Sequence, residues 1–465
     1  MPGHFGDTAI HILYIGLCAL LLAGCALPAM PDRAVSHALE PAQAAQTSLG
    51  QSAAPQLLLH PGQSGIHPLS DPLAAFAARM LLAHTAGRSL DVQYYIWRGD
   101  QSGTLLLQAL VGAADRGVRV RLLLDVGGTS GLDGMLAALA LHPQIEVRLF
   151  NPFVVRKPKP LGYLTDFGRA NRRMHNKSFT ADNQATIVGG RNVGDEYFGA
   201  TDGVLFSDLD VLVVGAVVPE VSHNFDRHWA SASAYPAQVI VSAVGPAELQ
   251  ALGTEATRVE ASDATQAYMQ AVRDTPFIQH LLEQKLNMEW SRTTLVSDDP
   301  LKGLGQAKRA GLLVHAGYAK HRKAMLQHGA ELHEMQRLAP PSRHARLNPL
   351  GSSGSSLHAK TFAADGTHAF VGSFNFDPRS ALLTTELGVV IDNPRLARQI
   401  EQAFETQIPG QSCRVQLSES GELEWQSGQD GTETPPTIYS VEPGSSWLSR
   451  WGMRVLALLT IDRLL

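Results

Sequence analysis

One polar phrase occurs twice in this chain, and it constrains the fold more than any other feature. The first copy, HNKSFTADNQATIVGGRN, covers residues 175–192, and the second, HAKTFAADGTHAFVGSFN, covers residues 358–375. His, Lys, Asp, Gly and Asn recur at identical offsets, 183 residues apart. The apolar, β-branched residues 185–188 inside the first copy are typical of a buried strand. The repeat predicts two structural halves that each contribute half of one site, rather than two surface hairpins with incidental histidines.

The repeated histidines suit the in-line displacement of a phosphodiester. Such a reaction needs a nucleophile on one side of phosphorus and a proton donor for the leaving oxygen on the other. One imidazole from each half, facing the other across a pseudo-twofold axis, would supply both. We expect His175 to be the nucleophile and His358 to act first as general acid and then as base. The near-symmetry of the two phrases leaves the opposite assignment open.

The other polar residues of the phrases suit the charge that develops in such a reaction. Lys177 and Lys360 would lie beside the non-bridging phosphate oxygens, where negative charge accumulates. Asn192 and Asn375 would add hydrogen bonds to the same oxygens. This scheme requires no metal ion and no cofactor, and the histidines elsewhere in the chain have no spacing typical of a ligand set.

Each catalytic imidazole also needs a carboxylate that holds its tautomer and orientation. Glu386 follows the second phrase in TTELGVVI, and Asp208 follows the first in SDLDVLVV after a longer loop. Both acids begin an apolar, strand-like run, so we expect them to fill this role. Asp182 and Asp365, inside the phrases, are expected to be structural and to stabilise the local turns.

The paired H-x-K-x-x-x-x-D motif resembles the signature of the phospholipase D superfamily. Flanking stretches resemble bacterial cardiolipin synthases of the C type over roughly residues 70–410, among them LGYLTDFGRANRRMHNKSFTADN, LFSDLDVLVVG and VGSFNFDPRSALLTTELGVVI. The resemblance implies a phosphatidyltransferase: one phospholipid loses its head alcohol to form a phosphatidyl-histidine, and the hydroxyl of a second phospholipid takes the phosphatidyl group.

Three alternatives to phosphatidyl transfer stay open. A phospholipase D-type phosphodiesterase would use water in place of the lipid hydroxyl. A nuclease would use the same chemistry, but the basic stretches at residues 151–192 and 301–346 lack the stacking aromatic residues that nucleic-acid binding favours, so no nucleic-acid partner is expected. The protein could also be an impaired or non-catalytic relic that binds lipid. No obligatory protein partner is evident from the sequence.

The order of periodic segments predicts the α/β class. Residues 90–97 and 118–126 are typical of buried strands and residues 103–116 of a helix between them, which makes a βαβ unit. We expect two phospholipase-D-like mixed-sheet halves that form one pseudo-twofold catalytic body. The expected divisions are a lipoprotein-type signal segment (1–25), a flexible tether (26–68), the first half (69–235), a connecting region with a helical run at 275–290 (236–290), a shortened second half (291–410) and a C-terminal extension (411–465).

The chain start and the local charge indicate a membrane. Residues 10–22 are apolar and end in Leu-Ala-Gly-Cys, which resembles a lipobox in which Cys25 is lipidated. The basic residues that usually precede such a segment are missing from residues 1–9, so an incorrect start codon or an uncleaved anchor are alternatives. All three place the protein on a membrane of the bacterial cell envelope.

Net charge is −5, yet residues 151–192 hold eight Lys or Arg against two Asp, which would attract anionic phosphate or a lipid surface.

The second half is expected to be shorter than the first. Residues 330–335 correspond to the strand at 145–150, and residues 316–327 correspond to the helix at 131–141. Only residues 303–315 precede that helix, where the first half has a strand, a helix and a second strand. The second half is therefore predicted to lack a βαβ unit, which would leave unpaired sheet edges near His358 and weaken or abolish activity.

Overall fold

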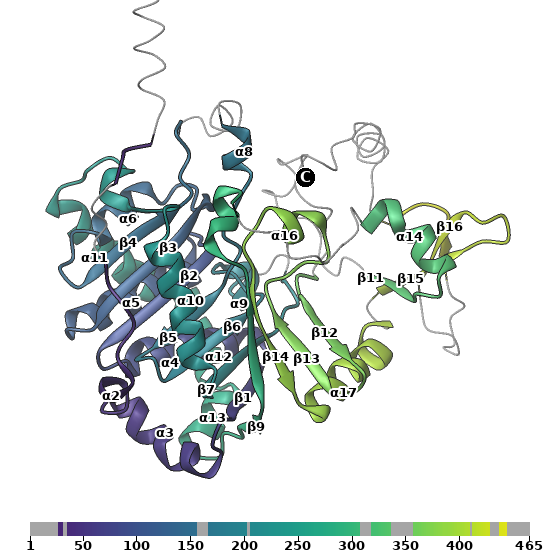
Figure 1. Cartoon of the computed structure of the whole chain (residues 1–465), viewed down its shortest axis with the longest axis horizontal. Helices are drawn as coiled ribbons and strands as arrows, with labels where there is room; N and C mark the ends of the chain where they lie inside the picture. The colour runs from purple at the N-terminus through teal and green to yellow at the C-terminus, as the bar shows by residue number, and fades with distance from the viewer. Residues whose placement is uncertain are drawn as a thin grey trace, which may run out of the picture.

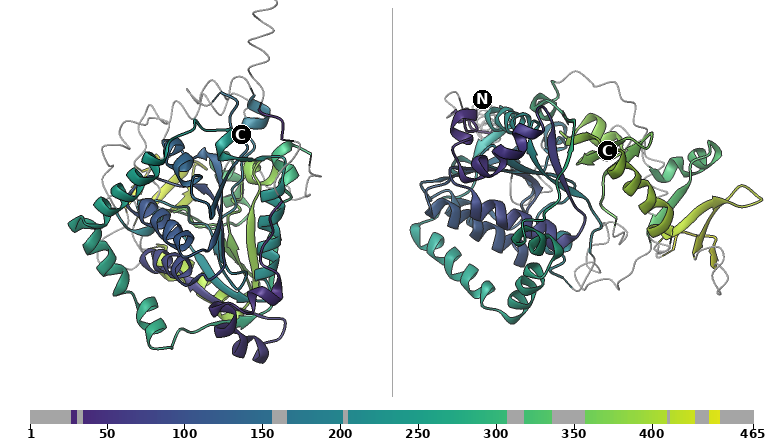
Figure 2. Two further views of the ribbon diagram at one scale, coloured as in Figure 1. Left: turned by 90° about the vertical axis from the view of Figure 1, so that its left-hand side faces the viewer. Right: turned by 90° about the horizontal axis from the view of Figure 1, so that it is seen from below.

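Three β-sheets carry the part of the chain that the structure describes. The structure is a computed structural model, and it describes residues 27–30, 35–155, 166–201, 205–306, 318–335, 357–409, 412–427 and 437–443. The smaller second sheet lies beside the large first sheet, and the third sheet, with α14 next to it, lies on the far side of the second (Figure 1). The right-hand view of Figure 2 shows the same succession from below.

A nine-stranded mixed sheet forms the first half, in the order β8-β4-β3-β2-β5-β6-β7-β1-β9. Its strands are β1 (Ser64–Leu69), β2 (Ser89–Ile96), β3 (Arg119–Gly128), β4 (Ile145–Phe150), β5 (Ser178–Ala181), β6 (Ala185–Gly189), β7 (Asp210–Gly215), β8 (Ala234–Pro236) and β9 (Glu289–Ser291). The strands β2, β3 and β4 are parallel, as the alternating pattern predicted. The first phrase forms the antiparallel hairpin β5–β6, which extends to β7.

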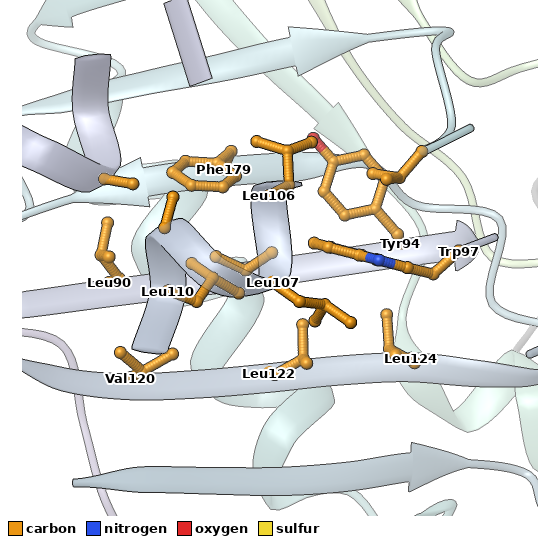
Figure 3. Packing of buried hydrophobic residues seen from close by; sticks show 14 of the residues in the cluster. Leu90, Tyr94, Trp97, Leu106, Leu107, Leu110, Val120, Leu122, Leu124 and Phe179 are labelled. Carbon is orange, nitrogen blue, oxygen red and sulfur yellow. The ribbon is translucent and has the colours of Figure 1, made fainter. Parts of the chain in front are cut away.

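Helices cover both faces of this sheet, and its central strands are buried on both sides. The helices of this region are α2 (Pro41–Ala44), α3 (Ser48–Leu59), α4 (Pro72–Thr85), α5 (Gln101–Asp115), α6 (Asp133–Leu139), α8 (Phe167–Ala170), α9 (Asp195–Phe198), α10 (Val218–Ala230), η1 (Ala237–Val239), α11 (Pro246–Glu260), α12 (Asp263–Arg273) and α13 (Pro276–Leu282). Leucines of α5 pack onto β2 and β3 in the main core (Figure 3). α10 covers the other face with Phe225 and Trp229, both fully buried.

A four-stranded antiparallel sheet forms the body of the second half, in the order β10-β14-β13-β12. Its strands are β10 (Thr293–Ser297), β12 (Thr361–Ala364), β13 (His368–Gly372) and β14 (Leu387–Asp392), and its helices are η2 (Pro300–Leu304), α16 (Pro378–Leu382), α17 (Pro394–Gln402) and the π-helical η3 (Ala403–Gln407). The second phrase forms the β12–β13 hairpin, the counterpart of β5–β6. One apolar cluster joins the two sheets across the interface between the halves, with Ile66, Val211 and Val213 on one side and Val371, Val389 and Ile391 on the other.

The third sheet has the order β11-β15-β16-β17 and is antiparallel throughout. It comprises β11 (Leu332–Met335), β15 (Ser412–Leu417), β16 (Leu423–Ser427) and β17 (Thr437–Tyr439), with α14 (Tyr318–Gln327) beside it. Its small core contains Leu332, Cys413, Val415 and Trp425. The Trp425 indole donates a hydrogen bond to Glu334 at 2.8 Å, which ties the sheet together at its edge.

The strand orders of the two halves correspond on both flanks but not in the centre. In the first half β5, β6 and β7 lie on one side of β2 and β3, and β4 and β8 lie on the other. In the second half β12, β13 and β14 repeat the first group, while β11 and β15 repeat the antiparallel pairing of β4 and β8. Within the described residues, no strand pairs with the outer edge of β12, which is the position that β2 takes beside β5.

The two motif aspartates also differ in their surroundings, and the difference lies at the position of β2. Asp182 is fully buried and accepts hydrogen bonds from the backbone N–H groups of residues 87, 88 and 89, at 2.8–2.9 Å, in the loop that leads into β2. Asp365, its counterpart, is exposed and has no hydrogen-bond partner among the described residues. Both have a φ of +53°, in the left-handed region that Asp and Asn tolerate. Asp182 therefore stabilises the approach to β2 rather than only its own turn.

This difference predicts unequal effects of one substitution at equivalent positions. Asp182→Asn puts an amide donor against backbone donors, so we expect it to lower the free energy of unfolding by about 2 kcal/mol. Asp365→Asn, which preserves the left-handed residue and loses no contact, should change it by less than about 0.5 kcal/mol. Urea denaturation of both variants checks this. Equal losses would mean that Asp365 has a partner like that of Asp182.

Two segments differ from the sequence-based expectation. Residues 41–68, expected to belong to a flexible tether, contain α2, α3 and most of β1. The Thr47 hydroxyl caps α3 by accepting from the N–H of Gly50 at 3.1 Å, and β1 pairs with both β7 and β9, which fixes the segment to the body. The helical run expected at 275–290 ends with α13, because Gln284 takes a φ of +56°; the chain then forms β9. α13 contacts α4 of the first half, and Phe277 joins that core.

Candidate active site

The two motif histidines lie at the ends of their hairpins, and each is held by backbone bonds to the opposite half. The N–H of His175 donates to the carbonyl of Thr385 at 2.8 Å. The N–H groups of His358 and Ala359 both donate to the carbonyl of Ser207 at 2.9 Å. Each phrase is therefore anchored just before its hairpin by a segment from the other half.

The carboxylates pair with the histidines across the halves. Nδ1 of His175, from the first phrase, lies 2.9 Å from Oε2 of Glu386, which belongs to the second half. Nδ1 of His358, from the second phrase, lies 2.5 Å from Oδ2 of Asp208, which belongs to the first half. The sequence predicted both acids as orienting carboxylates but did not assign either of them to a histidine. The crossed pairing means that neither half contains a complete histidine–carboxylate pair.

Two side-chain hydroxyls donate to the Glu386 carboxylate, and a backbone N–H donates to that of Asp208. The Ser373 hydroxyl donates to Oε2 of Glu386 at 2.5 Å, and the Thr384 hydroxyl donates to Oε1 at 2.7 Å. Oδ1 of Asp208 accepts from the N–H of Leu209 at 2.9 Å. Both acids are buried, so these bonds determine which oxygen each imidazole meets.

Arg191, a residue that sequence reasoning missed, organises the loop that carries Asp208. Its guanidinium donates to the carbonyl of Asp208 at 2.7 Å, and its backbone N–H donates to the carboxylate of Asp210 at 3.1 Å. Asp210 also accepts from the buried Arg79 at 2.8 Å. The only sequence signal was an arginine inside the first phrase whose counterpart, Phe374, is apolar.

The two motif lysines lie against the histidines and are buried. Nζ of Lys177 donates to the carbonyl of His175, and Nζ of Lys360 donates to that of His358, both at 2.5 Å. Nζ of Lys360 also lies 3.2 Å from Nε2 of His358. Burial lowers the pKa of both lysines, that of Lys177 well below its ordinary value. Both Nζ atoms therefore lie beside the motif histidines, and their contact with phosphate oxygens stays a prediction.

The histidine and carboxylate pKa values follow from this burial. Desolvation lowers the pKa of His175 to about 4, although Glu386 acts in the opposite direction. Burial would raise the pKa of Glu386, but the charges of His175 and Lys177 and the Ser373 bond lower it to about 2. The arrangement near pH 7 is therefore a neutral imidazole that donates Nδ1–H to an ionised carboxylate and has a free lone pair on Nε2. Desolvation also lowers the pKa of His358, which is less buried.

Aromatic rings pack against both imidazoles, and sequence reasoning missed them. Tyr95, at the end of β2, has its ring centroid 5.0 Å from that of His175. Tyr197 and Phe206, both from the first half, lie 5.2 and 5.4 Å from His358. These rings restrict rotation of each imidazole and exclude water from one side.

The two motif asparagines are placed differently from one another. Oδ1 of Asn192 accepts from the N–H of Ile96 at 3.2 Å, and its amide donates to the hydroxyl of Tyr197 at 3.1 Å. Asn192 is fully buried and links β2 to the aromatic ring that packs on His358. Asn375 is half-buried and has no such side-chain bonds among the described residues. The contact of both amides with phosphate oxygens stays a prediction.

Metal and membrane features are limited in the described part of the chain. No three His, Cys, Asp or Glu side chains converge there as metal ligands. None of its helices combines the length and the apolar character needed to cross a bilayer. Cys25, the basic residues 156–159 and the C-terminal segment from residue 444 lie outside the described residues.

Comparison with known proteins identifies the family. A profile described as "Cardiolipin synthase, PLD-like domain" matches residues 81–229 and 265–408, which contain both phrases. The chain is 42% identical over 481 aligned residues to cardiolipin synthase C of Escherichia coli (strain K12), covering 90% of this chain and 99% of the relative. The chain belongs to the phospholipase D superfamily. This confirms the predicted superfamily and the α/β class with two halves, and it makes the protein a phospholipase D superfamily enzyme.

Two further likenesses are more distant. An uncharacterized protein of Helicobacter pylori (strain ATCC 700392 / 26695) is 28% identical over 414 residues, covering 76% of this chain and 81% of the relative. Among solved structures, phosphatidylserine synthase of Haemophilus influenzae Rd KW20 is similar with a TM-score of 0.49 at 11% identity, covering 89% of this chain and 98% of that chain.

The lowered pKa of His175 predicts an unusual pH dependence for this phospholipase D superfamily enzyme. A nucleophilic His175 must be neutral, and its pKa of about 4 keeps it neutral until the pH falls to that value. The acid limb of kcat/KM should therefore lie near pH 4, well below the ordinary histidine value of about 6.5. In the unfolded chain His175 has its ordinary pKa and is protonated at a higher pH than in the folded protein. The free energy of unfolding should therefore fall as the pH is lowered from about 6.5 to about 4. A steady-state profile with an acid limb near pH 6.5 would contradict a buried, neutral His175.

Proposed function

We propose that this protein is a membrane-tethered, cardiolipin-synthase-like phosphatidyltransferase that acts through a phosphatidyl-histidine. The observation that carries the proposal is the pair of crossed histidine–carboxylate bonds beside two buried lysines. The 42% identity to a cardiolipin synthase C over 90% of this chain supports phospholipids as substrates. Lipidation of Cys25 would supply the tether.

In the first step Nε2 of His175 attacks the phosphorus of the donor lipid. The bond between phosphorus and the head-alcohol oxygen breaks, and protonated His358 gives its Nε2 proton to that oxygen. The lone pair on Nε2 of His175 is available because its Nδ1–H is donated to Glu386. A bound phosphodiester anion favours the protonated form of His358, as do Asp208 and its hydrogen bond. Lys177 and Lys360 would stabilise the charge on the non-bridging oxygens.

In the second step His358 acts as the base. It takes the proton from the hydroxyl of a second phospholipid, whose oxygen then attacks the phosphorus. The bond between phosphorus and Nε2 of His175 breaks, which restores a neutral His175 and a protonated His358. A hydrolase would follow the same path with water as the attacking group. The aromatic packing around both imidazoles, from Tyr95, Tyr197 and Phe206, restricts water near the site and supports a lipid acceptor.

Product analysis with the histidine variants tests this function. Purified protein in phospholipid vesicles should yield a lipid with two phosphatidyl groups and release the head alcohol, with little phosphatidic acid, as measured by mass spectrometry. His175→Ala and His358→Ala should each abolish turnover, and the double variant should be no worse than either, because the residues act as a unit. Phosphatidic acid as the main product would favour the hydrolase. A single variant that keeps a tenth or more of wild-type turnover would contradict the two-histidine mechanism.

A second candidate function is an impaired enzyme, and the strands missing from the centre of the second half favour it. The strand order lacks counterparts of β2 and β3 in the described residues, and Asp365 lacks the partners that Asp182 finds before β2. The alignment with the cardiolipin synthase C spans 481 positions while using 90% of this 465-residue chain, so the relative has residues where this chain has none. A βαβ unit needs about 30 residues or more. We therefore infer that a unit is missing between η2 and α14.

Loss of this unit would leave His358 itself well supported. Its backbone and its ring are held by Ser207, Asp208, Tyr197 and Phe206, all from the first half. The missing unit instead removes the neighbours that Asn375 would have, since Asn192 depends on Ile96 at the end of β2. We therefore expect a partial loss of activity, caused by a poorly positioned Asn375.

Inserting the relative's segment after Gly305 tests the impairment. Phosphatidyl transfer should rise roughly tenfold or more, because the added strands would position Asn375 and close the edge of β12. A glycine- and serine-rich insert of the same length at the same place is the control and should raise neither turnover nor stability. If the chain as it stands turns over lipid at the rate of the Escherichia coli relative, the missing unit is dispensable.

A further inference from the structure

Asn176 lies between the histidine and the lysine of the first phrase, yet its side chain bonds to neither. It is fully buried. Its amide nitrogen lies 3.3 Å from Nε2 of His228 and 3.4 Å from Oδ1 of Asn224, both on α10. Its Oδ1 accepts a hydrogen bond from the hydroxyl of Thr385 at 2.9 Å. Asn176 thus connects a helix of the first half with the segment of the second half that precedes Glu386.

The tautomer of His228 fixes the orientation of this amide. Nδ1 of His228 lies 3.0 Å from the carbonyl oxygen of Asn224, which can only accept, so Nδ1 carries the hydrogen. Burial lowers the pKa of His228 to about 4, so the ring is neutral near pH 7 and Nε2 is an acceptor. The amide nitrogen of Asn176 must then face His228, and its oxygen must face Thr385.

Thr385 is bonded to the first half on three sides. Its carbonyl accepts from the N–H of His175 at 2.8 Å, and its N–H donates to the carbonyl of Arg173 at 2.9 Å. Its hydroxyl is the donor to Asn176. The next residue is Glu386, whose carboxylate meets His175. The position of Thr385 therefore sets the position of Glu386 relative to the imidazole.

The second phrase contains no equivalent of this arrangement. Ala359 occupies the position of Asn176 and has no side-chain donor or acceptor. His358 is also more exposed than His175, with 20% of its side chain accessible against 10%. The additional bonds are therefore specific to the histidine that the proposed mechanism makes the nucleophile.

We propose that Asn176, His228 and Thr385 are positioning residues that hold the His175–Glu386 pair in its reactive geometry across the two halves. The proposal rests on the proposed function, since positioning acts on the histidine that would be phosphatidylated. Displacement of a reacting group by about 1 Å costs roughly a hundredfold in rate, so a buried network of this kind affects turnover more than lipid binding.

Thr385→Val tests the network, because it removes the hydroxyl and preserves the shape. Thr180→Val is the matched control: Thr180 is buried on β5, and among the described residues its hydroxyl bonds only to Thr186, at 2.7 Å. We expect Thr385→Val to lower kcat roughly tenfold or more with little change in KM, while Thr180→Val leaves both near wild type. Thr385→Ser, which restores the hydroxyl, should restore kcat. If Thr385→Val does not fold, Asn176→Ser takes its place, because the serine side chain is too short to reach both His228 and Thr385.

A measurement without substrate separates this proposal from the proposed function. Histidine-ring NMR, with His175 assigned by its absence in His175→Ala, follows the titration of His175 in each variant. Loosening the network should admit water, so the pKa of His175 should rise toward its ordinary value in Thr385→Val and not in Thr180→Val. If wild type turns over no phospholipid, the proposed function fails and the NMR result alone decides on the network. An unchanged His175 titration in Thr385→Val, or failure of Thr385→Ser to restore the wild-type titration, overturns the positioning role.

Discussion

Two hydrogen bonds that cross between the halves carry the geometry of the whole site. His175 meets a carboxylate of the second half, and His358 meets one of the first half, so the imidazoles are oriented only when the halves are docked. An apolar cluster holds that interface, with β-branched residues from both sheets. Because protein interiors are close-packed, the two halves can slide little against one another at this interface. The two histidine–carboxylate hydrogen bonds, of 2.5 and 2.9 Å, need such a rigid interface.

The halves share a phrase but not a supporting structure. The first half has the complete nine-stranded sheet, and it also supplies Ser207, Tyr197 and Phe206 around the histidine of the second half. The second half contributes Glu386 with its donors, while β12 has no described neighbour on its outer edge. This arrangement explains how a site with two equivalent motifs can have unequal histidines, one deeply buried and one more exposed.

The repeated offsets predicted the paired histidines and lysines, because a β-hairpin places residues at fixed spacings on one face. Glu386 and Asp208 lie outside the repeat and were predicted because each begins an apolar, strand-like run after its phrase. The apolar periodicity also predicted β2, α5, β3 and β4. The crossing could not be predicted, since it depends on how two sheets dock rather than on any local pattern. For the same reason Asn192 was expected to face phosphate, although it bonds to Ile96 and Tyr197, which are distant from one another in sequence.

A double-mutant cycle on the free energy of unfolding tests the crossed pairing most directly. His175→Ala and Glu386→Gln, separately and together, should show a coupling of roughly 1 kcal/mol or more, because each removes the same hydrogen bond. His175→Ala combined with Asp208→Asn should be additive within about 0.5 kcal/mol, since these residues share no bond. Additivity of His175 with Glu386, or coupling of His175 with Asp208 instead, would contradict the crossed arrangement.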